Sequence, residues 1–376
     1  MYGTNVWEAD ELNRLKSAEA PTFAGGGIMT YSYDSANQRI GLESAAGRFT
    51  YVHDSAGRMT SLVNPEGERT TFTYDNAGQR TSTRLANGTR ESVTYNSVGS
   101  IQRVVNLRAN NTTISSYLYS YNAGESRIAE IWEDGTRVTW TYDNAYRLTN
   151  ERRPGTNGFH ITHAYDPVGN RTKKTEDGVV TDYTHNAGNQ MVTEVTGGNR
   201  TTYTFDGAGN QETVETASSR TTMTWDFENR RTKHEQGRSS MRTTTTGDGR
   251  RFREQRIFAA VQYTRKHVWD QENVLYETDG SNVIQIAYIA QPSLGNLISQ
   301  RYSGNSRYYH FDAPGSTRQL TDAAGVLMAT NTSVRRARPG SSLATLDQLY
   351  TFVARLGYYT GIALKRILDN GGINRQ

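Results

Sequence analysis

The sequence predicts an all-β fold, in which a repetitive antiparallel β-hairpin ribbon coils into a curved or spiral sheet with little helix. Three observations predict it. A five-residue phrase, aromatic-acid-x-x-Gly, returns at intervals of about twenty residues. Thr and aromatic residues alternate before each copy. Pairs that favour hairpin loops lie between copies, such as Asn87-Gly88, Asp177-Gly178 and Gly197-Gly198.

Four segments are expected along the chain. An irregular N-terminal segment covers residues 1–30, with Gly25-Gly26-Gly27 as a flexible joint. The repeat array covers 31–246, and longer variants of the phrase occupy 247–330. An atypical C-terminal tail follows over 331–376.

The tail is the least repetitive part of the chain. Arg335-Arg336-Ala337-Arg338 and the Pro-Gly-Ser-Ser after it predict a solvated linker over 335–342. Residues 350–356 alternate as a strand, which we favour, although the apolar residues of this region also fit a helical stripe.

Within the array, each repeat is expected to form two short antiparallel strands and two turns. In Arg137 to Tyr142, Thr falls on one face and Val, Trp and Tyr on the other, the pattern of a half-buried strand. The Asp or Asn that follows can bond its own backbone, and the Gly three residues later supplies a positive φ.

The residues of the phrase are therefore predicted to be structural. They are Tyr74, Asp75 and Gly78; Tyr95, Asn96 and Gly99; Tyr142 and Asp143; Tyr165, Asp166 and Gly169; Phe205, Asp206 and Gly209; and, in the longer variant, Asp312, Gly315 and Arg318.

The composition indicates a thin core and no reactive centre. Only 35% of the 376 residues are hydrophobic, and the 23 Tyr suit strands that are wet on one side. The absence of Cys excludes disulfides, zinc ribbons and thiol catalysis. Turn formation accounts for the recurring carboxylates, and His160 and His163 fall on opposite faces of a strand. We expect no catalytic residue, metal or cofactor.

The charge of the chain does not favour a nucleic-acid partner. The net charge is +4, but the Arg residues are spread over the repeats rather than gathered into a patch. The first 16 residues lack the apolar run of a signal peptide, and no apolar stretch is long enough to span a bilayer.

Four tryptophans are candidates for carbohydrate contact, because an indole ring can stack on a sugar while Arg and Asn neighbours bond its hydroxyls. They are Trp132, Trp140, Trp225 and Trp269. Packing within the ribbon is the competing interpretation for each ring.

With these residues in view, the chain resembles the Rhs or YD-repeat family, named for the dipeptide seen at Tyr74-Asp75, Tyr142-Asp143 and Tyr165-Asp166. The stretch from His310 to Leu327 resembles the start of the family's core-associated region. The resemblance implies a ribbon that winds into a hollow shell around a C-terminal toxic domain, or that serves as a surface-binding module. The family's core end and toxin domain are expected to be missing here.

The sequence and the resemblance are compatible with two functions. The first is a non-enzymatic β-scaffold of an exported or cell-surface protein, with cell-surface polysaccharide or other Rhs shell segments as partners. The alternative is a truncated part of a polymorphic-toxin shell that encapsulates and delivers a C-terminal effector. An extracellular or cell-surface location is implied by the resemblance alone.

Overall fold

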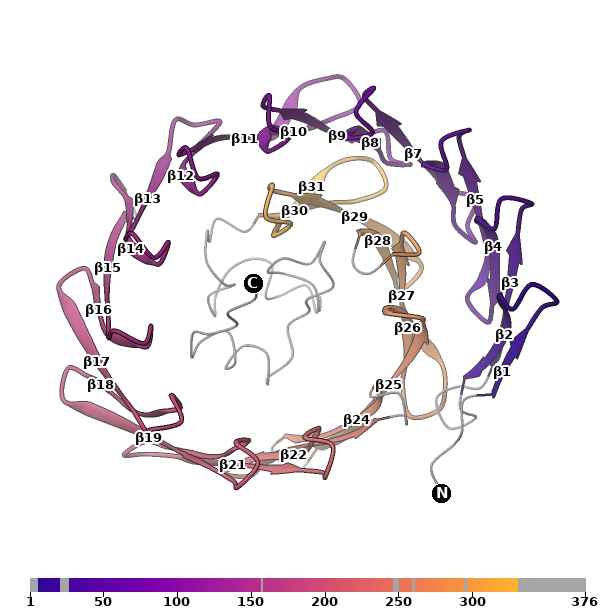
Figure 1. The fold of residues 1–376 in the computed structure, drawn as a ribbon. Helices are drawn as coiled ribbons and strands as arrows, with labels where there is room; N and C mark the ends of the chain where they lie inside the picture. Colours follow the sequence, from indigo (N-terminus) through magenta and orange to yellow (C-terminus); the bar gives the residue numbers. More distant parts are fainter. Residues whose placement is uncertain are drawn as a thin grey trace. The chain divides into compact units, whose positions relative to one another are not determined.

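The computed structural model describes residues 6–20, 27–156, 158–245, 250–258, 261–293 and 296–330 (Figure 1). These residues form a 31-stranded sheet without a helix. Successive strands pair antiparallel through short turns, as β6 (Met59–Val63) does with β7 (Arg69–Tyr74), and β7 with β8 (Arg80–Arg84). The predicted all-β hairpin ribbon is confirmed. The predictions for the Gly25-Gly26 joint and for the tail over 331–376 lie outside the described residues.

The chain divides into two compact units, residues 1–117 with 266–376, and residues 118–265. Within the first unit lie β1 (Val6–Ala9), β2 (Leu15–Ala20), β3 (Gly27–Tyr33), β4 (Arg39–Ser44), β5 (Gly47–His53), β6 (Met59–Val63), β7 (Arg69–Tyr74), β8 (Arg80–Arg84), β9 (Arg90–Tyr95), β10 (Ile101–Leu107), β26 (Asn273–Thr278), β27 (Ile284–Ala290), β28 (Leu297–Tyr302), β29 (Asn305–Phe311), β30 (Thr317–Thr321) and β31 (Leu327–Thr330).

The second unit is a run of consecutive hairpins. It contains β12 (Arg127–Trp132), β13 (Arg137–Tyr142), β14 (Leu148–Arg153), β15 (Phe159–Tyr165), β16 (Arg171–Glu176), β17 (Val179–His185), β18 (Met191–Thr196), β19 (Asn199–Phe205), β20 (Gln211–Glu215), β21 (Arg220–Trp225), β22 (Arg231–Gln236), β23 (Ser239–Thr245) and β24 (Arg251–Phe258). Two strands run across the unit boundaries, β11 (Thr113–Tyr121) and β25 (Val261–Asp270).

The irregular segment predicted for residues 1–30 is wrong within the described residues, because β1 and β2 form a hairpin there. Its turn runs from Asp10 to Arg14 and has the backbone hydrogen bonds of the later repeats. Asn13 takes the place of the usual Gly at φ 59°, which Asn tolerates better than other residues with a side chain. The phrase was missed because Ala9 replaces the aromatic residue and Asn13 the glycine.

The first unit has two layers. In Figure 1 the orange-to-yellow strands β26 to β31 lie alongside the indigo-to-purple strands β3 to β10. The strands of the first layer alternate between buried and exposed residues, as in β3 and β5. In contrast, β26 and β30 are buried at every position. Strands covered on both faces lose the period-two pattern of a half-buried strand.

The second unit keeps the alternating pattern. On one face, cross-strand neighbours bring together buried apolar residues, among them Trp140, Ile161, Tyr183, Tyr203, Val214 and Met241. We call this the aromatic face. Thr residues pair across strands on the opposite face, for example Thr141 with Thr149 and Thr204 with Thr213. This is the arrangement expected from Thr and aromatic residues in alternation.

Candidate functional site

The turn of the repeated phrase is a hydrogen-bonded five-residue unit, and the turn from Asp54 to Arg58 is representative. The Asp54 N–H donates to the Arg58 carbonyl at 2.9 Å, and the Gly57 N–H donates to the Asp54 carbonyl at 3.0 Å. Gly57 has a φ of 78°, as in a type I turn closed by a left-handed residue and a bulge. The Asp54 carboxylate accepts from the N–H groups of Ala56 and Arg58. The carboxylate is therefore part of the turn.

The residue after the glycine links one turn to the next. Arg58 Nε donates to Asp54 Oδ2 at 2.8 Å, and Arg58 Nη1 donates to the carbonyl of Asp75 at 3.1 Å. The guanidinium also lies 4.9 Å from the ring centre of Tyr74, within the range of cation–π attraction. Arg14 and Arg147 make the same three contacts in their own repeats.

The tyrosine of the phrase reaches back to the preceding repeat. The hydroxyl of Tyr74 donates to the carbonyl of Met59 at 2.7 Å, next to the bulge where the β5–β6 register shifts. A bulge leaves backbone groups out of the ladder, so the hydroxyl satisfies a carbonyl that would otherwise lack a strand partner. Equivalent bonds run from Tyr33 to Leu15, Tyr95 to Arg80, Tyr142 to Arg127 and Tyr165 to Leu148, and from the Trp225 indole N–H to Gln211.

These contacts also tune the carboxylates. The hydrogen bond from the Arg58 backbone N–H is the main cause that holds the pKa of Asp54 below its ordinary value; burial opposes it, and the Arg58 side chain adds to the lowering. The same contacts from Arg147 lower the pKa of Asp143. A hydrogen-bonded carboxylate of lowered pKa stays ionised and is poorly suited to act as a general acid.

The predicted phrase residues occupy these turn positions. Gly78, Gly99, Gly169 and Gly209 have φ values of 81°, 91°, 98° and 87°. Asp75, Asn96, Asp166 and Asp206 accept hydrogen bonds from the backbone of their own turns. In the Tyr142-Asp143 copy, Tyr146 stands where the other copies have Gly, with a φ of 58°. Phe205 ends β19 opposite Gln211, where its register shifts.

The longer variant places its charged residues inside the first unit. Asp312 accepts from the Ser316 N–H at 2.8 Å and from Arg318 Nε at 2.7 Å. The Gly315 N–H donates to the Asp312 carbonyl, with φ 83° at Gly315. The Arg318 side chain is 1% exposed and lies over the ring of Tyr117. Asp312, Gly315 and Arg318 therefore build a buried turn.

Side chains far apart in sequence join the two layers of the first unit. Arg39 donates to both carboxylate oxygens of Asp270, at 2.9 and 2.6 Å, and its guanidinium lies between the rings of Tyr31 and Tyr51. Further contacts run from Arg80 to Gln291, from Asn87 to Thr321 and the Asp322 carbonyl, from Asn106 to the Phe311 carbonyl, and from Ser115 to Gln319. Sequence reasoning missed all of these pairs, since residues so far apart give no periodic signal.

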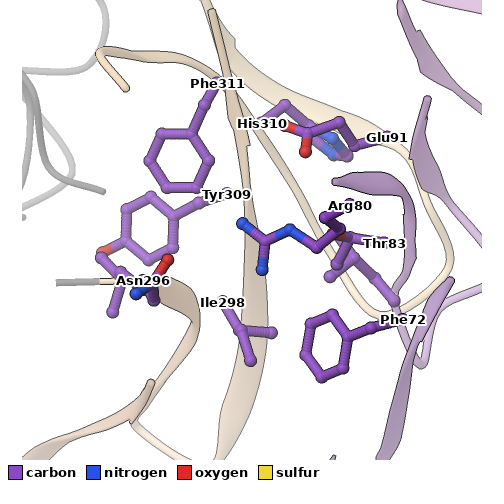
Figure 2. A pocket seen from close by; sticks show the side chains of 11 residues that line it. Phe72, Arg80, Thr83, Glu91, Asn296, Ile298, Tyr309, His310 and Phe311 are labelled. Atoms are coloured by element: carbon purple, nitrogen blue, oxygen red, sulfur yellow. The ribbon is translucent and has the colours of Figure 1, made fainter. Parts of the chain in front are cut away.

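A small cavity lies between the layers of the first unit (Figure 2). Arg80, Glu91 and Phe72 enter it from one layer, and Tyr309 and His310 from the other. Its volume is about 20 Å³, which is room for about one water molecule and too little for a substrate.

The side chain of His310 is buried in the wall of this cavity, and its imidazole contacts the neighbouring strand β30. Its Nε2 lies 2.9 Å from Thr321 Oγ1. Burial, aided by the charge of Arg108, lowers the pKa of His310 to about 3. The imidazole is therefore neutral at physiological pH and serves as a hydrogen-bonding group between strands.

A larger hollow of about 610 Å³ lies in the second unit over the turns that start at Asn122 and Asp143. The rings of Trp140, Tyr142 and Tyr146 line it. Asp143, the one titratable acid among its lining residues, is held by Arg147. The hollow has room for a ligand but no group set up for acid–base chemistry.

The four tryptophans predicted to contact carbohydrate are engaged in packing. Trp132 donates its indole N–H to Glu130, and Arg153 lies over its ring. Trp140 is 9% exposed, with Arg127 over its ring. Trp225 bonds the Gln211 carbonyl, and Trp269 packs against the core cluster of β26 to β31. Their placement favours the packing interpretation and does not support carbohydrate binding.

Other candidate reactive groups are separated or buried. Across the described ranges, no three His, Cys, Asp or Glu side chains lie close enough to hold a metal ion. His160 is exposed and contacts Asn150, whereas His163 is only partly buried on the other side of β15. His267 and Glu277 lie 3.6 Å apart but are 1% and 0% exposed, so a substrate cannot reach them.

Comparisons with known proteins agree with this architecture. Residues 53–90 match the family described as RHS Repeat. The fold is similar to the crystal structure of TcdB2-TccC3-TEV, with a TM-score of 0.62 and 12% identity over 94% of this chain. It is also similar to the Tc holotoxin pore of Photorhabdus luminescens with a mutated TccC3, with a TM-score of 0.58 and 13% identity over 88% of this chain.

This chain spans 21% and 19% of those two matched chains, about a fifth of their length. At such low identity the likeness is one of fold. No curated protein is significantly similar to this chain in sequence. The structure has no helix that could cross a bilayer in the part of the chain that it describes.

Proposed function

We propose that this RHS-repeat chain is a wall segment of a protein shell of the kind formed by RHS-type toxin proteins, and that it works as a non-enzymatic scaffold. The RHS match and the resemblance seen in the sequence agree on the repeat. The observation that carries the proposal is the superposition of 94% of the chain on TcdB2-TccC3-TEV. We therefore prefer a role as a wall segment of a shell to a role as a carbohydrate-binding surface module.

The chemistry of the repeats supports a scaffold. In the described turns, the recurring Asp, Arg and Tyr side chains bond one repeat to the next, as Arg58 does to Asp75 and Tyr74. A side chain held by two or three neighbours resists movement, which suits a wall and does not suit a catalytic group that must exchange protons with a substrate.

We propose that the partners of this segment are other RHS-type shell segments, since the matched chains contain further length beyond the part that it covers, and that the assembled shell holds an effector polypeptide. An exported or cell-surface location follows from this role, and fractionation of the producing cells with an antibody against the chain tests it.

The experiment is purification of the native complex from its source under mild conditions, followed by mass spectrometry and proteinase K digestion. We expect a particle much heavier than the 42.0 kDa chain, containing further RHS-repeat polypeptide. An enclosed polypeptide should resist the protease until the particle is denatured. Recovery of the chain as a monomer without associated polypeptide contradicts the proposal.

A further inference from the structure

One arginine position recurs directly after the turn in several repeats, two residues after the position of positive φ. Its occupants in the first unit are Arg39 and Arg80, and in the second unit Arg127, Arg171 and Arg231. Four of the five stack on an aromatic ring: Arg39 on Tyr31 and Tyr51, Arg80 on Phe72, Arg127 on Tyr119 and Trp140, and Arg171 on Tyr183.

Those rings come from a fixed place in the repeat, two residues before the aromatic residue of the phrase. For Arg231 the two corresponding places hold Met223, two residues before Trp225, and Thr243 in the next strand pair. Neither side chain offers a π face. Arg231 therefore lacks the ring that accompanies the guanidinium in the other four repeats.

Arg231 also lacks an acidic partner among the residues that the structure describes, and its Nε has no hydrogen-bond acceptor there. The next repeat places a second cation, Arg251, at the equivalent register, opposite Thr245 as Arg231 is opposite Trp225. Burial and the charge of Arg251 lower the pKa of Arg231 to about 10. Arg251 pairs with the carboxylate of Glu254 at 3.3 Å, so Arg231 is the cation of the two that has no carboxylate partner among the described residues.

The neighbourhood carries more positive charge than the rest of the chain. Residues 230–256 contain nine Lys and Arg and three Asp and Glu, a net charge of +6, whereas the whole chain carries +4. On the aromatic face, the buried carboxylate of Glu254 is shared by Arg251 and Arg256. The arginines are therefore less evenly spread along the chain than the repeat pattern predicts.

The first unit shows what fills the equivalent position. Arg39 binds Asp270 through two parallel hydrogen bonds from a second strand layer. Such fork-to-carboxylate geometry is specific for planar two-oxygen anions. A carboxylate on an Asp or Glu side chain is thus the group that this repeat position accepts within the same chain.

We propose that Arg231, on the aromatic face of the second unit, is a docking site for an acidic polypeptide segment, which contributes an Asp or Glu carboxylate as Asp270 does for Arg39. The site is a property of this face and does not depend on the shell role. Within that role the acidic segment belongs to a second strand layer, as Asp270 does in the first unit.

The test is titration of the full-length chain with poly-L-glutamate of about 20 residues, near physiological ionic strength so that exposed charges are screened. Arg231→Met copies the apolar side chain of Met223 and removes the charge. We expect it to weaken binding at least tenfold. The matched control is Arg171→Met at the same repeat position, where the charge stacks on Tyr183, and it should change binding less than threefold.

Folding of the variants is checked by circular dichroism and by thermal unfolding. The proposal also predicts the direction in which Tm changes. Removing one of two neighbouring cations should leave the Tm of Arg231→Met unchanged or higher, and Arg231→Gln serves as a second variant. Equal binding by the wild type and both Arg231 variants overturns the proposal, as does a lowered Tm without loss of binding. Tighter binding of tripolyphosphate or of duplex DNA of equal charge also overturns it, in favour of a phosphate site.

Discussion

Arg39 and Asp270 lie 231 positions apart in the sequence and form an ion pair with two hydrogen bonds, in which each side chain is 8% exposed. The pair joins the two layers of the first unit between the rings of Tyr31 and Tyr51. Removing one partner of such a buried ion pair is strongly destabilising, because the other charge is then left buried without compensation.

Asp270→Asn should therefore destabilise the first unit by about 3 to 5 kcal/mol, because it leaves the buried guanidinium uncompensated. The measurement is urea unfolding followed by tryptophan fluorescence. Asp182→Asn is the control. The Asp182 side chain is 58% exposed and forms a long ion pair of 3.7 Å with Lys173, so the substitution should change the free energy of unfolding by less than about 1 kcal/mol. The double variant Arg39→Met with Asp270→Met should recover most of the loss, and equal losses in Asp270→Asn and Asp182→Asn contradict the assignment.

Tyr74→Phe removes the hydroxyl that bonds the Met59 carbonyl and keeps the ring under Arg58. We expect a loss of about 1 kcal/mol in the free energy of unfolding, the usual contribution of one hydrogen bond. Tyr146→Phe is the control because its ring is 68% exposed, and it should stay within about 0.5 kcal/mol of the wild type. No difference between the two variants argues against the bulge-capping role.

Gly78→Ala tests the backbone requirement of the turn. Gly78 has a φ of 81° and open space where a Cβ would lie, so the cost is conformational alone, about 1 to 2 kcal/mol. Gly207 sits in the Asp206 turn with equal space around it and is not among the residues with positive φ. Gly207→Ala should be neutral or slightly stabilising, and thermal unfolding of both variants checks the difference.

His310 predicts a pH dependence of the first unit. Its pKa in the folded chain is about 3, below the ordinary value of about 6.5, so the unfolded chain binds the proton more readily. The contribution of the neutral ring is complete above about pH 6.5 and is lost as pH falls, by about 1.4 kcal/mol per unit.

The measurement is urea unfolding at several values between pH 6.5 and 5, where carboxylates such as Asp54, with its lowered pKa, remain ionised. His310→Gln should flatten the slope over this interval. His160→Gln, at an exposed position, should leave it unchanged. A slope that survives His310→Gln shows that another group is responsible.

The fold class could be predicted because its signals are local. Asp75, Gly78 and the alternation of Thr with aromatic residues act within a few positions of one another, so each copy of the phrase reports its own turn and strand. The hairpin of β1 and β2 was not predicted, because Ala9 and Asn13 stand where the aromatic residue and the glycine mark the turn in other copies.

The tryptophans show where local reasoning stops. The sequence places Trp140 on the face of β13 opposite the Thr residues, but it does not tell whether that face is open. Arg127 comes from the neighbouring strand and lies over the ring, so the protein itself packs against one face of the indole. Which side chain covers a ring depends on strand order and register, and these follow from the completed sheet.

The sequence by itself determined the hairpin ribbon, the repeat and the work of Asp and Gly in each turn, because turn and strand chemistry is decided over about five neighbouring residues. Only the tertiary structure decided that Arg39 meets Asp270 and that Arg231 has no acidic partner among the described residues. The carboxylate partner of an arginine at a fixed repeat position is set by the segment that packs against it from elsewhere in the chain, and the repeat pattern carries no information about that segment.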